Sequence, residues 1–153
     1  ELVSGVVMGM GIVLISFFIQ AKTVTFDAVL ISVPSMILVG AIMLSNNIRD
    51  IVGDTEGGRK TLAILVGRGA AVNILAAFFI VSFAWIVGLI IFNDLTWFAL
   101  IVFICVKKPI DAVYLFKAKE QPLEVMPAMK WTAQTNTFFV FLLAIALGLS
   151  LFF

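Results

Sequence analysis

Residues 70–92 of this 153-residue chain read AAVNILAAFFIVSFAWIVGLIIF, and no position in the stretch carries a charged side chain. A helix of roughly 20 predominantly apolar residues is long enough to cross the hydrocarbon core of a bilayer. The stretch therefore predicts a membrane-spanning helix, and the sequence on either side of it decides what kind of membrane protein this is.

Four further apolar stretches accompany it. Hydrophobic residues make up 63% of the chain and charged residues 12%, whereas charged residues are about 25% of ordinary soluble proteins. We predict an all-α, polytopic membrane helix bundle that forms part of one domain over residues 1–153. The five predicted spans cover residues 2–19, 28–45, 70–92, 95–114 and 131–153. Asp27 and Asp94 precede two of these spans and are predicted to cap their helices.

The positive charges predict how the bundle lies in the membrane. Of the ten Lys and Arg residues, only Lys22 lies outside two connections, those after the second and fourth predicted spans. An alternating path places both connections on one face, and the positive-inside rule makes that face cytoplasmic. The span 95–114 is the weakest of the five predictions, because its purely apolar part ends at Val106; Lys107 and Lys108, which follow, are counted with the second connection.

The composition also excludes several kinds of function. A net charge of +1 is too small to predict nucleic-acid binding. The chain has no histidine and a single cysteine, Cys105, so zinc, haem and histidine-based acid–base catalysis are not expected.

The polar run between the second and third spans, residues 46–61, reads NNIRDIVGDTEGGRKT. If the preceding helix continues into it, Asn46, Asp50 and Asp54 follow one another at four-residue spacing and share one face. Two carboxylates with an amide oxygen beside them suit Mg²⁺, which completes its octahedron with water and phosphate oxygens. The spacing therefore favours a magnesium site at the water-facing end of a membrane helix.

Two basic residues, Arg59 and Lys60, follow the acids after a glycine pair. Arginine binds phosphate through two parallel hydrogen bonds and lysine binds it as a point charge. Together with the acids they predict a diphosphate site, and the membrane setting favours a diphosphate with a lipid tail. A solvated loop whose charges pair on the surface fits the same residues, and the residues alone leave both interpretations open.

The pattern also resembles a known family. The second aspartate-rich motif of the UbiA superfamily of intramembrane prenyltransferases is similar to Asn46-Asn47-x-Arg49-Asp50-x-x-x-Asp54-x-x-x-Gly58-Arg59-Lys60-Thr61-Leu62. The two ends of the motif most resemble the branch that prenylates 1,4-dihydroxy-2-naphthoate in menaquinone synthesis. Weaker resemblance covers residues 1–11 and 126–136.

The resemblance implies a partner that this chain lacks. The family has nine transmembrane helices and an earlier aspartate-rich motif, and nothing here matches that motif. The five predicted spans correspond to family helices five to nine. The chain is therefore expected to be the C-terminal portion of a prenyltransferase, inactive without the N-terminal part, in the cytoplasmic membrane of a prokaryote.

The resemblance also implies a reaction. A polyprenyl group would pass from polyprenyl diphosphate to 1,4-dihydroxy-2-naphthoate, with loss of diphosphate and of the ring carboxylate. Asp50 and Asp54 are expected to hold Mg²⁺ and to be the catalytic pair. The diphosphate is expected to contact Asn46, Asn47, Arg49, Arg59 and Lys60. One alternative is another aromatic acceptor, 4-hydroxybenzoate or homogentisate; another is a transport or structural module without chemistry.

Overall fold

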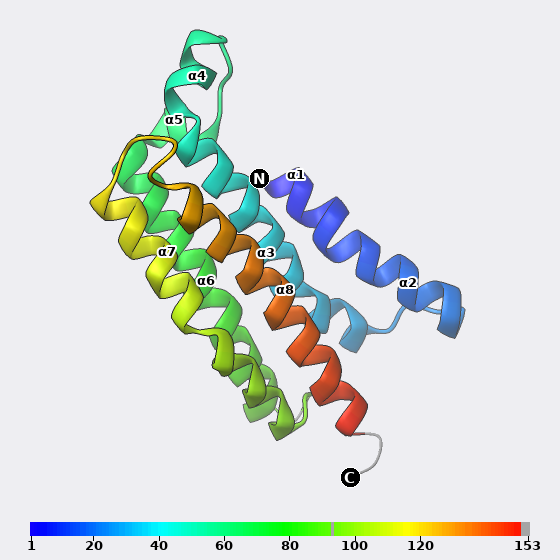
Figure 1. Ribbon diagram of the computed structural model, residues 1–153. Helices are drawn as coiled ribbons and strands as arrows, with labels where there is room; N and C mark the ends of the chain where they lie inside the picture. The colour runs from blue at the N-terminus through cyan, green and yellow to red at the C-terminus, as the bar shows by residue number, and fades with distance from the viewer. Residues whose placement is uncertain (93, 151–153) are drawn as a thin grey trace.

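The computed structural model describes residues 1–92 and 94–150, and within them every regular element is a helix. The predicted all-α bundle is therefore confirmed. Figure 1 shows long helices lying side by side, with two short helices gathered at one end. In chain order the helices are α1 (Leu2–Ser4), the π-helix η1 (Gly5–Gly11), α2 (Ile12–Ala21), α3 (Phe26–Arg49), α4 (Ile51–Glu56), α5 (Leu62–Val66), α6 (Arg68–Ile91), the 3₁₀ helix η2 (Trp97–Cys105), α7 (Lys107–Ala118) and α8 (Met126–Leu149).

Among the described residues, four helical rods are long and apolar enough to cross a membrane: Leu2–Ala21, which joins α1, η1 and α2, and the helices α3, α6 and α8. They match four of the five predicted spans. The helices α3, α6 and α8 begin two to five residues before the predicted spans, and the first rod ends two residues after its predicted span, because helical hydrogen bonds continue where the hydrophobic pattern stops. The predicted end of the last span, residues 151–153, lies outside the described residues.

The remaining predicted span, residues 95–114, has a different structure. It contains the 3₁₀ helix η2 followed by the twelve-residue α7, and it is absent from the four candidate spans among the described residues. Pro109 lies in the first turn of α7, where its missing backbone N–H costs no helical hydrogen bond, so a new α-helix begins at this point.

This break also corrects the position of two lysines. Lys107 and Lys108 were predicted to lie in the second basic connection, but they begin α7, about ten residues before that helix ends at Ala118. The connection itself covers residues 119–125. Most of the length of α7 therefore separates Lys107 and Lys108 from this connection.

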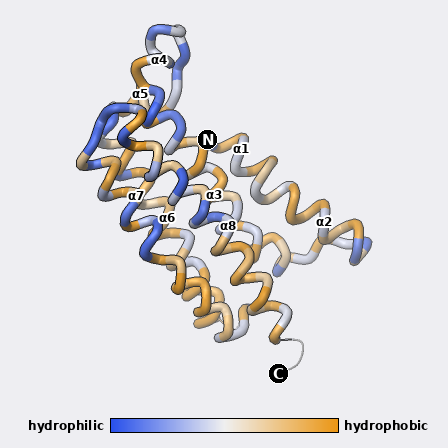
Figure 2. The backbone as a smooth tube through the Cα atoms, viewed as in Figure 1, coloured by the Kyte–Doolittle hydropathy of each residue, from blue (hydrophilic) through white to orange (hydrophobic). Residues whose placement is uncertain are grey.

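The two connections do meet at one end of the bundle, as the distribution of basic residues predicted. Arg68, at the start of α6, donates hydrogen bonds to the backbone oxygens of Ile48 in α3 and Phe116 in α7. Arg49 at the end of α3 contacts the sulfur of Met126 at the start of α8, at 3.5 Å. We refer to this end, with α4 and α5 and the connection 119–125, as the polar end; Figure 2 shows its hydrophilic colour.

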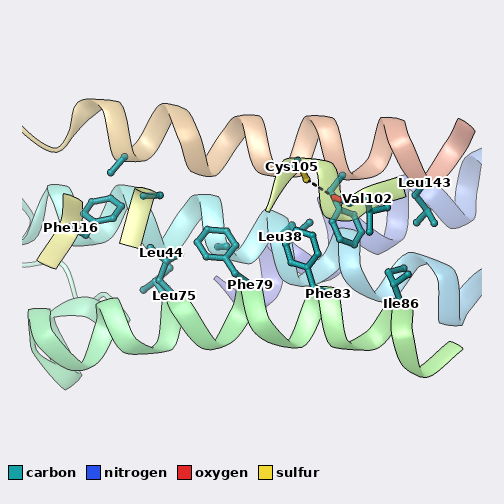
Figure 3. Packing of buried hydrophobic residues seen from close by; sticks show 14 of the residues in the cluster. Leu38, Leu44, Leu75, Phe79, Phe83, Ile86, Val102, Cys105, Phe116 and Leu143 are labelled. Carbon is teal, nitrogen blue, oxygen red and sulfur yellow. Dashed lines mark hydrogen bonds between the residues drawn. The ribbon is translucent and has the colours of Figure 1, made fainter. Parts of the chain in front are cut away.

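The core lies where α3, α6, η2, α7 and α8 pack together. Figure 3 shows Phe79 and Phe83 pointing from α6 between the neighbouring helices, and both are almost fully buried. The ring of Phe83 lies 5.2 Å from that of Phe103 in η2 and 5.1 Å from that of Phe139 in α8, between ring centroids. These aromatic contacts join three helices.

The first rod packs against α3 through two glycines one turn apart. A Cβ atom on Gly5 would lie 2.5 Å from the backbone oxygen of Met36, and one on Gly9 would lie 2.6 Å from the Cα of Met36. Small residues at four-residue spacing allow membrane helices to approach this closely. The rod therefore holds Glu1, at its start, beside the last turns of α3.

The two predicted helix caps are wrong by two residues each. The side chain of Thr25, and not that of Asp27, accepts a hydrogen bond from the backbone of its helix, α3. Thr96 does the same for η2 in place of Asp94. Threonine and aspartate both cap helices well, so the sequence did not distinguish between neighbouring candidates.

Candidate functional site

The polar run begins where α3 ends. Asp50 leaves helical geometry, with φ −96° and ψ 12°, and α4 starts at the next residue. The backbone still donates from Asp50 to the oxygen of Asn46 at 3.0 Å and from Asp54 to that of Asp50 at 2.8 Å. The three residues are therefore spaced one turn apart, as a continuous helix would place them.

Asp50 pairs with its neighbour in sequence. The Arg49 guanidinium donates from Nε and Nη2 to the two carboxylate oxygens of Asp50, each at 2.6 Å. The hydrogen bond from Arg49, with its positive charge, lowers the pKa of the Asp50 carboxyl below its usual value despite partial burial. Asp50 is therefore a carboxylate at neutral pH, half exposed at the polar end.

Asp54 has a different environment. Its side chain is only 8% exposed, and one oxygen, Oδ1, accepts from Arg59 Nη1 at 2.8 Å. The other oxygen, Oδ2, is buried and has no hydrogen-bond partner among the described residues. A buried carboxylate oxygen without a partner is costly, and a bound cation would satisfy it. This oxygen fits a magnesium ligand.

The structure does not assemble a complete metal site. The part of the chain that it describes contains no group of three or more His, Cys, Asp or Glu side chains placed to hold one ion. Asp50 and Asp54 each contact a separate arginine. Mg²⁺ accepts one or two protein carboxylates with water and phosphate oxygens, so two carboxylates from this chain are chemically suited to part of its coordination sphere.

The other predicted residues divide into two groups. Arg49 and Arg59 lie directly on the two carboxylates, whereas Lys60 is exposed and forms no hydrogen bond or ion pair with the described residues. The chain turns at Gly58, after α4, with a φ of +70° that favours glycine, and Lys60 follows this turn away from the two carboxylates. Asn46 is half buried and has no side-chain hydrogen bond within 1–92 and 94–150.

Asn47 has a partner that the motif did not predict. Its Nδ2 donates to the Oε1 of Glu1 at 2.7 Å, across 46 positions of sequence. The only feature of the sequence that could have indicated this contact was an acidic residue, Glu1, at the start of a long apolar stretch. Glu1 also lines a groove of about 460 Å³ between the first rod and α3, whose other lining residues are Leu2, Gly5, Met36, Ile37, Gly40, Leu62 and Phe78.

Arg68 is a second residue whose role was missed. Besides Ile48 and Phe116 it donates to the backbone oxygen of Lys119 at 2.5 Å, so one side chain contacts the last turns of both α3 and α7. Carbonyls in the last turn of a helix have no partner within the helix. The sequence showed only a basic residue in a connection, because the carbonyls that it binds are distant in the chain.

With this geometry established, comparison with known proteins decides the family. The model of the UbiA prenyltransferase family matches residues 1–125. The chain belongs to the UbiA prenyltransferase family. A curated UbiA relative, the 1,4-dihydroxy-2-naphthoate octaprenyltransferase of Bacillus subtilis (strain 168), is 55% identical over 152 residues, which cover 99% of this chain and 49% of the relative. The chain thus spans about half the length of the relative. No solved structure matches it.

Proposed function

We propose that the whole protein transfers a polyprenyl group from polyprenyl diphosphate to 1,4-dihydroxy-2-naphthoate, and that this chain supplies half of its active site. The observation that carries the proposal is the buried Oδ2 of Asp54, which has no hydrogen-bond partner in the part of the chain that the structure describes and lies beside Arg59 at the polar end. Family membership and the activity named for the 55% identical relative support the reaction and its acceptor.

Asp50 and Asp54 would hold Mg²⁺, which supplies positive charge that stabilises diphosphate as a leaving group. Arg59 and Lys60 would bind the phosphate oxygens from the α4 side, where both side chains are exposed. Breaking the carbon–oxygen bond lets diphosphate leave with the bonding electrons and gives an allylic centre with cationic character. A carbon of the electron-rich acceptor ring attacks this centre, and the ring regains aromaticity when its carboxylate leaves as carbon dioxide. The N-terminal part of the enzyme would provide the first aspartate-rich motif.

The groove beside Glu1 supports a site for the prenyl chain. It is lined almost entirely by apolar side chains and lies against α3 and the ring of Phe78 in α6. The groove would shelter the first isoprene units from water, which would otherwise capture the allylic cation. An aromatic ring is also attracted to a developing positive charge.

Incubation of the full-length protein with Mg²⁺, polyprenyl diphosphate and each of three acceptors tests the function. We expect prenylated, decarboxylated product from 1,4-dihydroxy-2-naphthoate, with a kcat/KM at least about 100-fold above those for 4-hydroxybenzoate and homogentisate. A hydrophobic cavity alone discriminates less than polar recognition does. A higher kcat/KM for another acceptor would show that the enzyme acts on that acceptor instead. Absence of prenylated product with all three acceptors would refute the proposed function.

We also propose that the polar end faces the cytoplasm, since the basic residues gather there. In full-length protein with Cys105 replaced by alanine, Glu56→Cys should react with an impermeant maleimide from the cytoplasmic side only. Thr23→Cys, in the connection between α2 and α3 at the other end of α3, is the matched control and should react from the other side. Labelling of the two positions in the reverse pattern would invert the orientation.

A further inference from the structure

A half-buried lysine lies along the side of the bundle, away from the polar end. Lys108 is near the start of α7 and Gln134 lies one third of the way along α8, so both are roughly 12–15 Å along their helices from the polar end. Figure 2 shows hydrophilic colour extending along α7 into the body of the bundle. An ionised side chain at the centre of a bilayer costs roughly 2.5–3.5 kcal/mol even on the most favourable scale, and ionisable residues within membrane helix bundles generally have a function.

No acidic side chain among the described residues compensates the charge of Lys108. Its Nζ donates to Oε1 of Gln134 at 2.8 Å and lies 5.1 Å from the centre of the Phe138 ring. Both partners are neutral, and no carboxylate among the described residues forms an ion pair with it, including that of Asp111 one turn further along α7. An ammonium group has three donors, so two remain for a ligand.

The surroundings select the ligand. A single cation next to one amide oxygen suits a ligand with one delocalised negative charge. A diphosphate carries more charge and would need several basic residues. Phe138 is 42% exposed and so can present part of its ring as a surface on which another ring can stack. A small aromatic ring that carries one carboxylate satisfies both features.

We propose that Lys108, positioned by Gln134 and stacked over Phe138, binds the carboxylate of the aromatic acceptor. The inference rests on the proposed function, because it assigns to the acceptor a place separate from the diphosphate site at Asp54. Lys108 is thereby a specificity-determining residue: it favours acceptors that carry a carboxylate.

The neighbouring Lys107 offers a matched control. Lys107 carries the same charge and directly precedes Lys108 in α7. It is exposed, however, and forms no hydrogen bond or ion pair with the described residues. In the full-length enzyme, Lys108→Met should raise the KM for 1,4-dihydroxy-2-naphthoate about 10–100-fold, the usual effect of losing a charged hydrogen bond. The KM for prenyl diphosphate, and the kcat/KM for 1,4-dihydroxynaphthalene, which lacks the carboxylate, should change less than about two-fold. Lys107→Met should match the wild type.

A second variant separates ligand binding from a structural tie between helices. Gln134→Glu would convert the hydrogen bond into an ion pair, which keeps the link between α7 and α8 but neutralises Lys108. We expect the same loss for the carboxylated acceptor and an unchanged thermal midpoint. Wild-type KM in this variant would overturn the proposal, as would a Lys108→Met variant impaired equally with both acceptors.

Direct binding keeps this test independent of turnover. Titration of wild-type, Lys108→Met and Gln134→Glu proteins with 1-hydroxy-2-naphthoate and with 1-naphthol should show that only the carboxylated ring loses affinity in the variants. Carboxylate-dependent binding without prenyl transfer would contradict the proposed function alone. Normal transfer with equal affinities in all three proteins would contradict the present inference alone.

Discussion

Replacement of Asp54 by asparagine should reduce prenyl transfer by the full-length enzyme about 10²–10³-fold while leaving the fold intact. Asparagine keeps an oxygen that can accept from Arg59, so the turn from α4 to α5 survives. The substitution removes the negative charge from the buried oxygen that has no partner among the described residues. Loss of one preorganised electrostatic contact with a developing charge has this magnitude in other enzymes.

Glu56 provides the matched control for this substitution. It lies two residues further along α4, its side chain is exposed, and it forms no ion pair within the described residues. Glu56→Gln removes the same charge from the same helix and should retain wild-type kcat. Initial rates over a range of prenyl diphosphate concentrations check both variants. Asp54→Asn activity within a factor of three of the wild type would exclude a catalytic role.

Replacement of Arg68 by methionine should lower the free energy of unfolding by about 3–5 kcal/mol. The guanidinium donates to three backbone oxygens, in residues 48, 116 and 119, and hydrogen bonds to charged groups contribute roughly 1.5–3 kcal/mol each. These contributions are not fully additive. Methionine leaves carbonyls at the ends of α3 and α7 without their donor.

Unfolding of the full-length protein in mixed micelles with increasing dodecyl sulfate measures this effect. Lys130→Met is the control, because Lys130 is an exposed basic residue in the first turns of α8 with no partner among the described residues. It should change stability by less than about 0.5 kcal/mol. Arg68→Lys should be intermediate, since lysine lacks the rigid fork that reaches separate carbonyls. Equal stability of the Arg68 and Lys130 variants would show that the ties at the polar end are dispensable.

Much of the fold could be predicted from apolar runs alone. The uncharged stretch 70–92 predicted a helix that the structure places at Arg68–Ile91. The prediction was weakest where lysines and Pro109 interrupted the pattern, and there the structure contains a 3₁₀ helix and a separate α-helix. Hydrophobicity identifies a stretch that avoids water, but it carries little information about where a helix changes its hydrogen-bonding pattern.

The candidate site was predictable only where its residues are close together in the sequence. Asp50 and Asp54 could be grouped with Arg49 and Arg59 because they are close in sequence, and the structure places each acid on one of these arginines. The contacts of Glu1 with Asn47, of Arg68 with Phe116 and of Lys108 with Gln134 join segments far apart in the chain. No local spacing encodes such contacts, which depend on how the helices pack.

The central claim is that the carboxylates of Asp50, between α3 and α4, and of Asp54, in α4, bind the diphosphate through a magnesium ion. Calorimetric titration of the full-length protein with a slowly reacting prenyl thiodiphosphate, with and without Mg²⁺, tests it most directly. We predict that Mg²⁺ tightens binding at least about ten-fold in the wild type and in Glu56→Gln, but less than two-fold in Asp54→Asn. Equal tightening by Mg²⁺ in all three proteins would contradict the account.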